Sequence, residues 1–148
     1  MELTELRTRD PAMIRRLTEV WEASVRATHH FLTEAEIQRI GGYVPLALCG
    51  VAHLVVAERT PGRPVAFLGA EGERLEMLFL APAERGAGLG RRLVEHAIAA
   101  YGVRTVTVNE QNPQAVGFYE HLGFRTVRRT DRDEEGGPYP LLYMSRSG

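Results

Sequence analysis

Apolar side chains recur every three or four residues after Pro11, which is the spacing of one face of an α-helix. Asp10 and Pro11 are typical of a capping residue followed by proline at the first helical position. Thr33 and Glu36 form a capping-box pattern, so a second helix is predicted to begin there. The apolar positions of these two helices are Met13, Ile14, Leu17, Val20, Trp21 and Val25, then Ile37 and Ile40.

The rest of the chain alternates between strand patterns and two further helices. Glu2 to Thr8 predicts a first strand, and His53 to Pro82 predicts three more, joined by turns at Pro61-Gly62 and Glu71-Gly72. A helical stripe follows from Leu89 to Tyr101, then a strand over Thr105 to Val108, a short helix over Gln114 to His121, and strands from Arg125 and over Leu141 to Met144. We therefore predict a single α+β domain over residues 1–148, with a mixed, mostly antiparallel sheet of about six or seven strands and about four helices.

A glycine-rich run, Arg85-Gly86-Ala87-Gly88-Leu89-Gly90-Arg91, lies between a predicted strand and the third predicted helix. Glycines let backbone amides converge on an anion, and a helix start adds partial positive charge, so this run predicts a pyrophosphate site. The dinucleotide pattern fails because Arg91 fills its third glycine position. The nucleotide triphosphate loop also fails, because it needs a lysine and all the basic residues of this chain are arginine.

What remains is R-x-x-G-x-G, at Arg85, Gly88 and Gly90, which resembles the coenzyme A pyrophosphate loop of the GNAT superfamily of acetyl-coenzyme A dependent N-acetyltransferases. The segment from Val108 to Phe124 resembles the strand, Asn, helix, Tyr, Gly-Phe signature of the same family. The segments Ala27 to Leu32, Leu93 to Ala97 and Gly137 to Leu142 are also similar to a small bacterial member. The resemblance spans most of the chain and implies the GNAT acyl-coenzyme A N-acyltransferase fold.

The resemblance implies that acetyl-coenzyme A binds along the strand before the glycine run and over that run. The corresponding residues are Met77, Leu78, Phe79 and Leu80, then Arg85, Gly86, Ala87, Gly88, Leu89, Gly90, Arg91 and Arg92, with Asn112 and Tyr119 on the following segment. Three of these residues also suit a purely structural role: Leu78 and Leu80 in a core, and Asn112, before Pro113, as a helix cap. For the two leucines both roles can hold at once, whereas for Asn112 they are alternatives, of which the cofactor contact is preferred.

Tyr119 occupies the family position of a general acid that protonates the departing thiolate, although a tyrosine there could also serve packing alone. Glu76 is the candidate general base, with an edge carboxylate or a partner for arginine as the alternative, and His29, His30 or a water as other bases. The acceptor-pocket candidates are Trp21, His29, His30, Phe31, Tyr43 and Tyr139, because they fall in segments that shape this pocket in the family. We expect half of them at most to touch an acceptor.

The resemblance therefore implies an enzyme that moves acetyl from acetyl-coenzyme A to a primary amine, by direct attack in a ternary complex. The alternative is a binding module that senses an acyl-coenzyme A without transferring the acyl group. The acceptor is a small-molecule amine or a protein amine, and nothing in the sequence chooses between them. The chain is expected to be a monomer or a homodimer.

The composition of the chain argues against several other classes of binding partner. Eighteen basic residues against nineteen acidic ones give a net charge of −1, which argues against a broad nucleic-acid surface. No apolar run approaches the length of a membrane span, and His29 with His30 are too few for a metal site, so neither membrane nor metal is expected. Cys49, the single cysteine, lies in an apolar stretch that we expect to be buried and unreactive. A cytoplasmic location follows from the lack of a disulfide and of a secretion signal.

Overall fold

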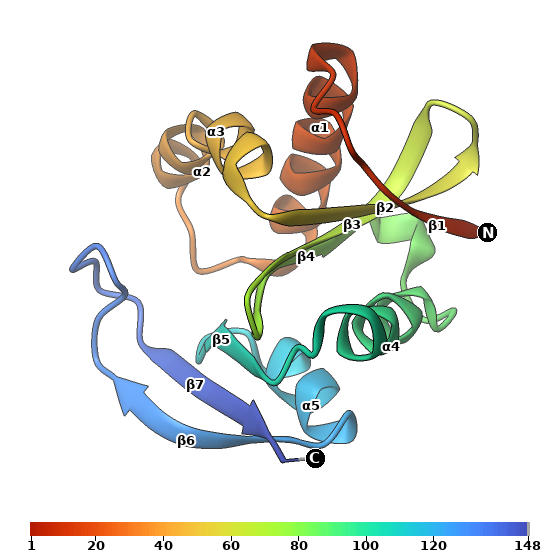
Figure 1. Ribbon diagram of the computed structural model, residues 1–148. Helices are drawn as coiled ribbons and strands as arrows, with labels where there is room; N and C mark the ends of the chain where they lie inside the picture. Colours follow the sequence, from red (N-terminus) through yellow and green to blue (C-terminus); the bar gives the residue numbers. More distant parts are fainter. Residues whose placement is uncertain (148) are drawn as a thin grey trace.

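The computed structural model describes residues 1–147 and shows one sheet with helices on both faces (Figure 1). The strands are β1 (Glu2–Glu5), β2 (His53–Thr60), β3 (Arg63–Glu71), β4 (Arg74–Leu80), β5 (Thr105–Asn109), β6 (Phe124–Thr130) and β7 (Leu141–Arg146). The helices are α1 (Pro11–Thr28), α2 (Glu34–Gly41), α3 (Val44–Gly50), α4 (Leu89–Tyr101) and α5 (Pro113–His121), with a 3₁₀ turn over Pro82–Glu84. The α+β prediction is confirmed.

Within the described residues the sheet has seven strands in the order β1-β2-β3-β4-β5-β7-β6. All neighbouring strands pair antiparallel except β4 and β5, which pair parallel across the helix α4. The parallel pair is the consequence of a strand-helix-strand connection. The mixed, mostly antiparallel sheet is therefore as predicted.

The predicted helix starts are confirmed by their caps. The Asp10 side chain accepts a hydrogen bond from the Met13 amide at 3.2 Å, and Thr33 accepts from the Glu36 amide at 3.1 Å. The reciprocal half of the predicted capping box does not form, because the Glu36 carboxylate binds Arg39 instead. The sequence analysis does not predict α3, whose short apolar run is buried at Val44 and Leu48 only.

Two hydrophobic cores lie on opposite faces of the sheet. One joins α1, α2 and α3 to strand positions such as Phe67, and it includes Trp21 of α1. The other joins α4 and α5 to Leu68 and continues under the C-terminal strands, where Phe124 is 1% exposed. Since successive residues of a strand face opposite sides, β4 sends Met77 and Phe79 to the first core and Leu78 and Leu80 to the second.

β4 and β5 pair over a short distance and then part. Their register contains only Arg74 with Thr105 and Leu75 with Val106. On the other side of β4, Leu75 pairs with Ala70 and Met77 with Gly69, so Glu76 is an extra residue in a β-bulge. A bulge bends its strand, and this one lies where the pairing with β5 ends. Figure 1 shows the gap that opens between the two halves of the sheet.

Candidate active site

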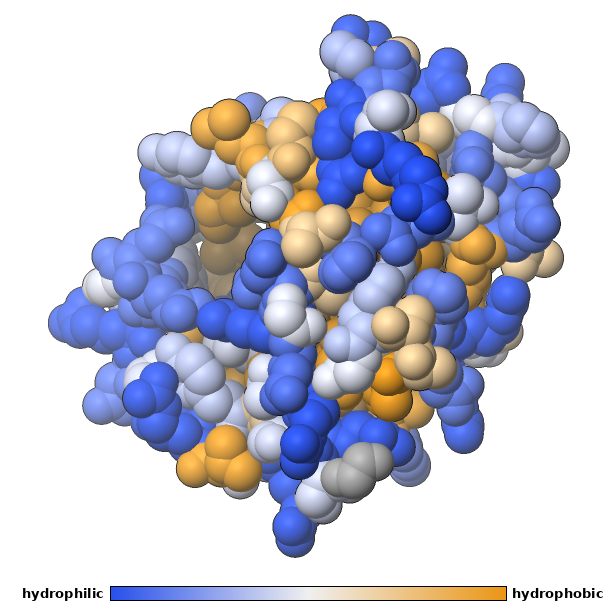
Figure 2. Space-filling view, viewed as in Figure 1, coloured by the Kyte–Doolittle hydropathy of each residue, from blue (hydrophilic) through white to orange (hydrophobic). Residues whose placement is uncertain are grey.

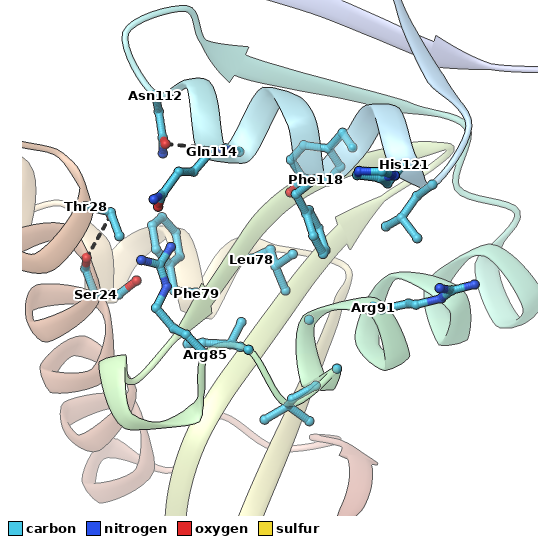
Figure 3. A pocket seen from close by; sticks show the side chains of 18 of the residues that line it. Ser24, Thr28, Leu78, Phe79, Arg85, Arg91, Asn112, Gln114, Phe118 and His121 are labelled. Carbon is cyan, nitrogen blue, oxygen red and sulfur yellow. Dashed lines mark hydrogen bonds between the residues drawn. The ribbon is translucent and has the colours of Figure 1, made fainter.

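A cavity of about 640 Å³ opens where β4 leaves β5, between the glycine run, α1 and α5. Figure 3 shows Ser24 and Thr28 of α1 on one side, Asn112 at the start of α5 and Gln114 of α5 on the other, and Arg85 between them. The lining consists of Ser24, Thr28, His29, Leu78, Phe79, Leu80, Arg85, Gly86, Gly88, Leu89, Gly90, Arg91, Asn112, Gln114, Ala115, Phe118, Tyr119, His121 and Leu122. The cavity therefore collects the predicted strand, the predicted loop and the predicted helix in one place.

The glycine run has the geometry of an anion site at the start of α4. Gly86 and Gly88 have φ angles of 82° and 84°, a left-handed conformation that other residues adopt only at a cost, and Gly88 caps the helix. Gly90 faces a close neighbour, since a Cβ on it would lie 3.3 Å from the Phe118 ring. Arg85 and Arg91 line the same cavity, and Arg91 also pairs with Glu95 at 3.2 Å, so the loop combines backbone amides and cations of the kind that bind a diphosphate.

Tyr119 lies on α5, and Asn112 directly precedes this helix. Asn112 caps this helix, with its side-chain oxygen accepting from the Ala115 amide at 3.3 Å, and it is 9% exposed at the cavity wall. Tyr119 is 7% exposed, and burial raises the pKa of its phenol, so the hydroxyl keeps its proton at neutral pH. Among residues 1–147 the Tyr119 hydroxyl has no hydrogen-bond partner. Within the described residues it is therefore an unpaired hydroxyl of a residue that lines the cavity.

A second cavity, of about 370 Å³, lies between α1, α2, β4 and the loop that joins β6 to β7. Figure 2 shows a hollow with apolar walls and a polar rim at this side of the molecule. Its lining consists of Trp21, Val25, His29, Phe31, Leu32, Arg39, Ile40, Arg74, Glu76, Phe79, Thr107, Asn109, Asp133, Glu134, Glu135, Tyr139 and Leu141. Aromatic walls and a mainly carboxylate rim suit an amine on an aliphatic stem.

His29 and Phe79 line both cavities, so the two spaces meet at these side chains. The His29 ring packs against Phe31 and Phe79, with centroid separations of 5.3 and 6.5 Å. Burial, and then the positive charge of Arg85, lower the pKa of His29 to about 4. The imidazole is therefore neutral at neutral pH.

Glu76, at the bulge of β4, opens on the second cavity. Its side chain is 34% exposed, and its carboxylate lies 3.5 Å from the guanidinium of Arg74. Arg74 also donates to Glu134 at 3.0 Å and to Thr107 at 3.1 Å. The predicted alternative for Glu76, a partner for arginine, is thus realised in the structure.

The structure places some predicted site residues outside both cavities. Met77 packs into the core that includes Phe67, and its side chain lies against Gly69. Ala87 is exposed on the loop, and Arg92 donates to the carbonyl of Met1 at 2.9 Å. His30 is exposed on the turn after α1, and Tyr43 is 59% exposed at the start of α3. Of the six acceptor candidates, Trp21, His29, Phe31 and Tyr139 line the second cavity.

One further expectation is wrong: Cys49 is exposed, not buried. The apolar stretch around it forms the helix α3, and a helix turns part of its residues to solvent whatever their type.

Sequence analysis missed several lining residues. Ser24 and Thr28 lie one helical turn apart, and Ser24 is a buried polar residue in the apolar stripe of α1. That irregularity was a usable signal. Ala115, Phe118 and Leu122 could have been found too, because they lie three or four residues from Tyr119 or beside it on α5. The residues Arg39, Arg74 and Glu134 come together only through the tertiary fold.

Over the described residues, there is no group of three or more His, Cys, Asp or Glu side chains placed to hold a metal ion. Over the same range no helix has the length and apolarity needed to cross a membrane.

Comparisons with known proteins identify the family and the fold. Residues 30–139 match the acetyltransferase (GNAT) domain family. The chain is 43% identical over 137 residues to the peptidyl-lysine N-acetyltransferase YjaB of Escherichia coli, covering 89% of each protein. The solution structure of apo YjaB from Escherichia coli matches with a TM-score of 0.87 at 38% identity, over 100% of this chain and 99% of that one. The PaiA N-acetyltransferase of Thermoplasma acidophilum, solved with coenzyme A, has the same fold, with a TM-score of 0.68, 16% identity and 99% and 100% coverage.

Proposed function

Since the chain belongs to the GNAT acetyltransferase family and is an N-acetyltransferase, we propose that it transfers the acetyl group of acetyl-coenzyme A to a lysine side chain of a protein. The observation that carries this proposal is the pair of cavities that meet at His29 and Phe79. Two substrates that approach from opposite sides can react directly at such a junction. No covalent enzyme intermediate is then required.

The first cavity takes acetyl-coenzyme A in this proposal. Its volume and the unpaired edge of β4 suit a long arm that bonds to the backbone, in the manner of an added strand. The loop at Gly86 and Gly88, with Arg85 and Arg91, takes the pyrophosphate. A β4 amide and the Tyr119 hydroxyl then lie near the thioester end, where the amide stabilises developing charge and Tyr119 protonates the departing sulfur.

The second cavity takes the acceptor lysine. Its walls at Trp21, Phe31 and Tyr139 suit the methylene stem, and Phe31 and Tyr139 lie 5.9 Å apart at their ring centroids. Glu134 and Glu135 at the rim favour a cationic group. The YjaB proteins carry the name peptidyl-lysine N-acetyltransferase, which supports a protein amine over a small-molecule amine.

Further properties belong to the same proposal. The exposed free thiol of Cys49 suits a reducing compartment, so we place the reaction in the cytoplasm. We propose that one domain carries the whole reaction, as a monomer or a homodimer.

The test is to incubate the protein with acetyl-coenzyme A and either a lysine peptide library or a pool of small amines, and to score acetylated products and released thiol by mass spectrometry. The chain contains no lysine, so self-acetylation of side chains gives little background. Acetylated lysine peptides are the expected product. Products confined to the small-amine pool would overturn the protein acceptor. Bound acetyl-coenzyme A with no product in either pool would instead favour the sensing module.

A further inference from the structure

His29 is the titratable side chain shared by the linings of the two cavities, within the residues that the structure describes. It follows the last residue of α1, and its backbone is fixed on both sides. Its amide donates to the Val25 carbonyl at 2.8 Å, and its carbonyl accepts from the Leu32 amide at 3.1 Å. The backbone of His29 is therefore held at the junction of the two cavities.

Thr28 determines which nitrogen of the His29 ring carries the proton. The Thr28 hydroxyl donates to the Ser24 carbonyl at 2.8 Å, which uses its single hydrogen (Figure 3). The same oxygen lies 2.7 Å from Nδ1 of His29, so Nδ1 must be the donor in that contact. A neutral ring with hydrogen on Nδ1 has a free lone pair on Nε2. Among residues 1–147, no hydrogen bond occupies Nε2.

Glu76, the base expected from sequence, is less suited to this step. Its carboxylate already lies beside the Arg74 guanidinium, and it lines the second cavity without reaching the first. His29 reaches both. A base for the attacking nitrogen has to stand where both substrates are present.

We propose that Nε2 of His29 accepts the proton that the amine nitrogen loses when it attacks the thioester, and that Thr28 positions the ring for this role. This inference rests on the proposed acetyl transfer. The lysine ammonium group first loses one proton to solvent. The neutral nitrogen then forms its bond to the carbonyl carbon, the carbonyl π pair moves to oxygen, and one N–H proton moves to Nε2. The pair on oxygen re-forms the carbonyl as the carbon–sulfur bond breaks, and the electron pair of that bond leaves on sulfur, which takes a proton from Tyr119. The proton on His29 returns to the Tyr119 phenolate through solvent, so the enzyme is restored.

The charges around His29 are consistent with a neutral ring that accepts a proton only transiently. Its low pKa, about 4, is due to burial first, then to Arg85, then to its neighbour His30. The other titratable groups that line the two cavities are Tyr119, His121 and Arg91 in the first, and Arg39, Arg74, Glu76, Asp133, Glu134, Glu135 and Tyr139 in the second. A base with so low a pKa can take a proton from the acidic nitrogen of the adduct more readily than from a free ammonium group.

The test compares His29→Asn with the wild type. Asparagine can still donate to Thr28 from the position of Nδ1, but it has no basic nitrogen. We expect kcat to fall about 100-fold or more, while the KM for acetyl-coenzyme A stays within about threefold. In the wild type, kcat/KM should fall as the pH drops below the ordinary range of histidine pKa values. This acid limb of the pH profile should disappear in the variant. Thr28→Val should lower kcat about tenfold, because the ring loses its orienting contact. His96→Asn, on α4 outside both cavities, is the matched control and should keep full activity.

Three results would overturn the inference: a kcat for His29→Asn within about threefold of wild type, an unchanged acid limb, or ring-nitrogen NMR shifts of the wild type that put the hydrogen on Nε2. The NMR measurement needs no activity. If His29→Asn fails to bind coenzyme A, Thr28→Val and the NMR tautomer decide the question. A wild type that binds acetyl-coenzyme A but acetylates no amine would refute the proposed function itself, whereas an active wild type with an active His29→Asn refutes only the role of His29.

Discussion

Tyr119 combines near-complete burial with a hydroxyl that has no partner among the described residues. Replacing it by phenylalanine therefore removes a proton donor and little else. We expect Tyr119→Phe to lower kcat about tenfold or more, because the thiolate must then be protonated by water. The free energy of unfolding should change by less than about 1 kcal/mol. A thiol release assay measures the change in kcat, and urea denaturation measures the change in the free energy of unfolding.

Tyr101→Phe is the matched control for this substitution. Tyr101 also has a raised pKa, about 12, but it donates to Glu5 of β1 and stacks on His53 of β2, outside both cavities. Its variant should lose stability and keep kcat. If the Tyr119→Phe protein keeps its full kcat, the phenol of Tyr119 serves packing only.

His29 also gives the molecule a pH-dependent stability. Its pKa is about 4 in the folded protein against 6.5 for an ordinary histidine, so between these values the unfolded chain binds more protons than the folded one. Stability therefore falls as pH falls through this window. Relative to His29→Asn, the wild type should lose about 2 kcal/mol of unfolding free energy between neutral pH and about pH 4.5. Urea denaturation of both proteins at the two pH values measures this difference, and a constant difference would mean that the ring titrates normally.

At the scale of elements, substitutions at two glycines can distinguish an effect on cofactor binding from an effect on stability. Gly88 has a φ of 84° and Gly72, in the turn between β3 and β4, has a φ of 58°, and neither has a neighbour within 4 Å of an added Cβ. Alanine at either position should cost about 1 to 2 kcal/mol of stability through backbone strain. Only Gly88→Ala should raise the KM for acetyl-coenzyme A, about tenfold, because it turns the loop amides away from the diphosphate. Equal KM values for the two variants would mean that this loop does not bind the cofactor.

The elements that sequence predicted are those with local signals. Asp10, Thr33 and Gly102 mark helix ends through contacts within a few residues, and the structure has those ends. The bulge at Glu76 has no such signal, and α3 has Pro45 in its first turn but no side-chain cap. The bulge shows only in the register with β3, and α3 is too short for its apolar spacing to stand out. This explains why the loop and α5 were predicted and the relation of Glu76 to Arg74 was an open alternative.

At the scale of the whole molecule, the second cavity depends on contacts between the two halves of the sheet. Beyond Leu75 the halves part, and the loop between β6 and β7 reaches back across the gap. Glu134 binds Arg74 of β4 at 3.0 Å, and Glu135 binds Arg39 of α2 at 3.1 Å. Residues separated by such distances in sequence carry no common pattern, so this rim could not be predicted from the chain alone.

These ion pairs give a prediction for the acceptor. Exposed pairs contribute little to stability, so the double variant Glu134→Gln/Glu135→Gln should fold normally. It loosens the loop and removes two carboxylates from the path of a cationic substrate, and both effects should raise the KM for a lysine peptide several-fold. The Kd for coenzyme A, measured by calorimetry, should stay within about threefold because the first cavity is untouched. Glu22→Gln/Glu34→Gln removes the same charge from exposed pairs at Arg26, outside both cavities, and should leave both constants unchanged. If the two double variants raise the peptide KM equally, the overall field of the protein attracts the acceptor and the rim does not contact it.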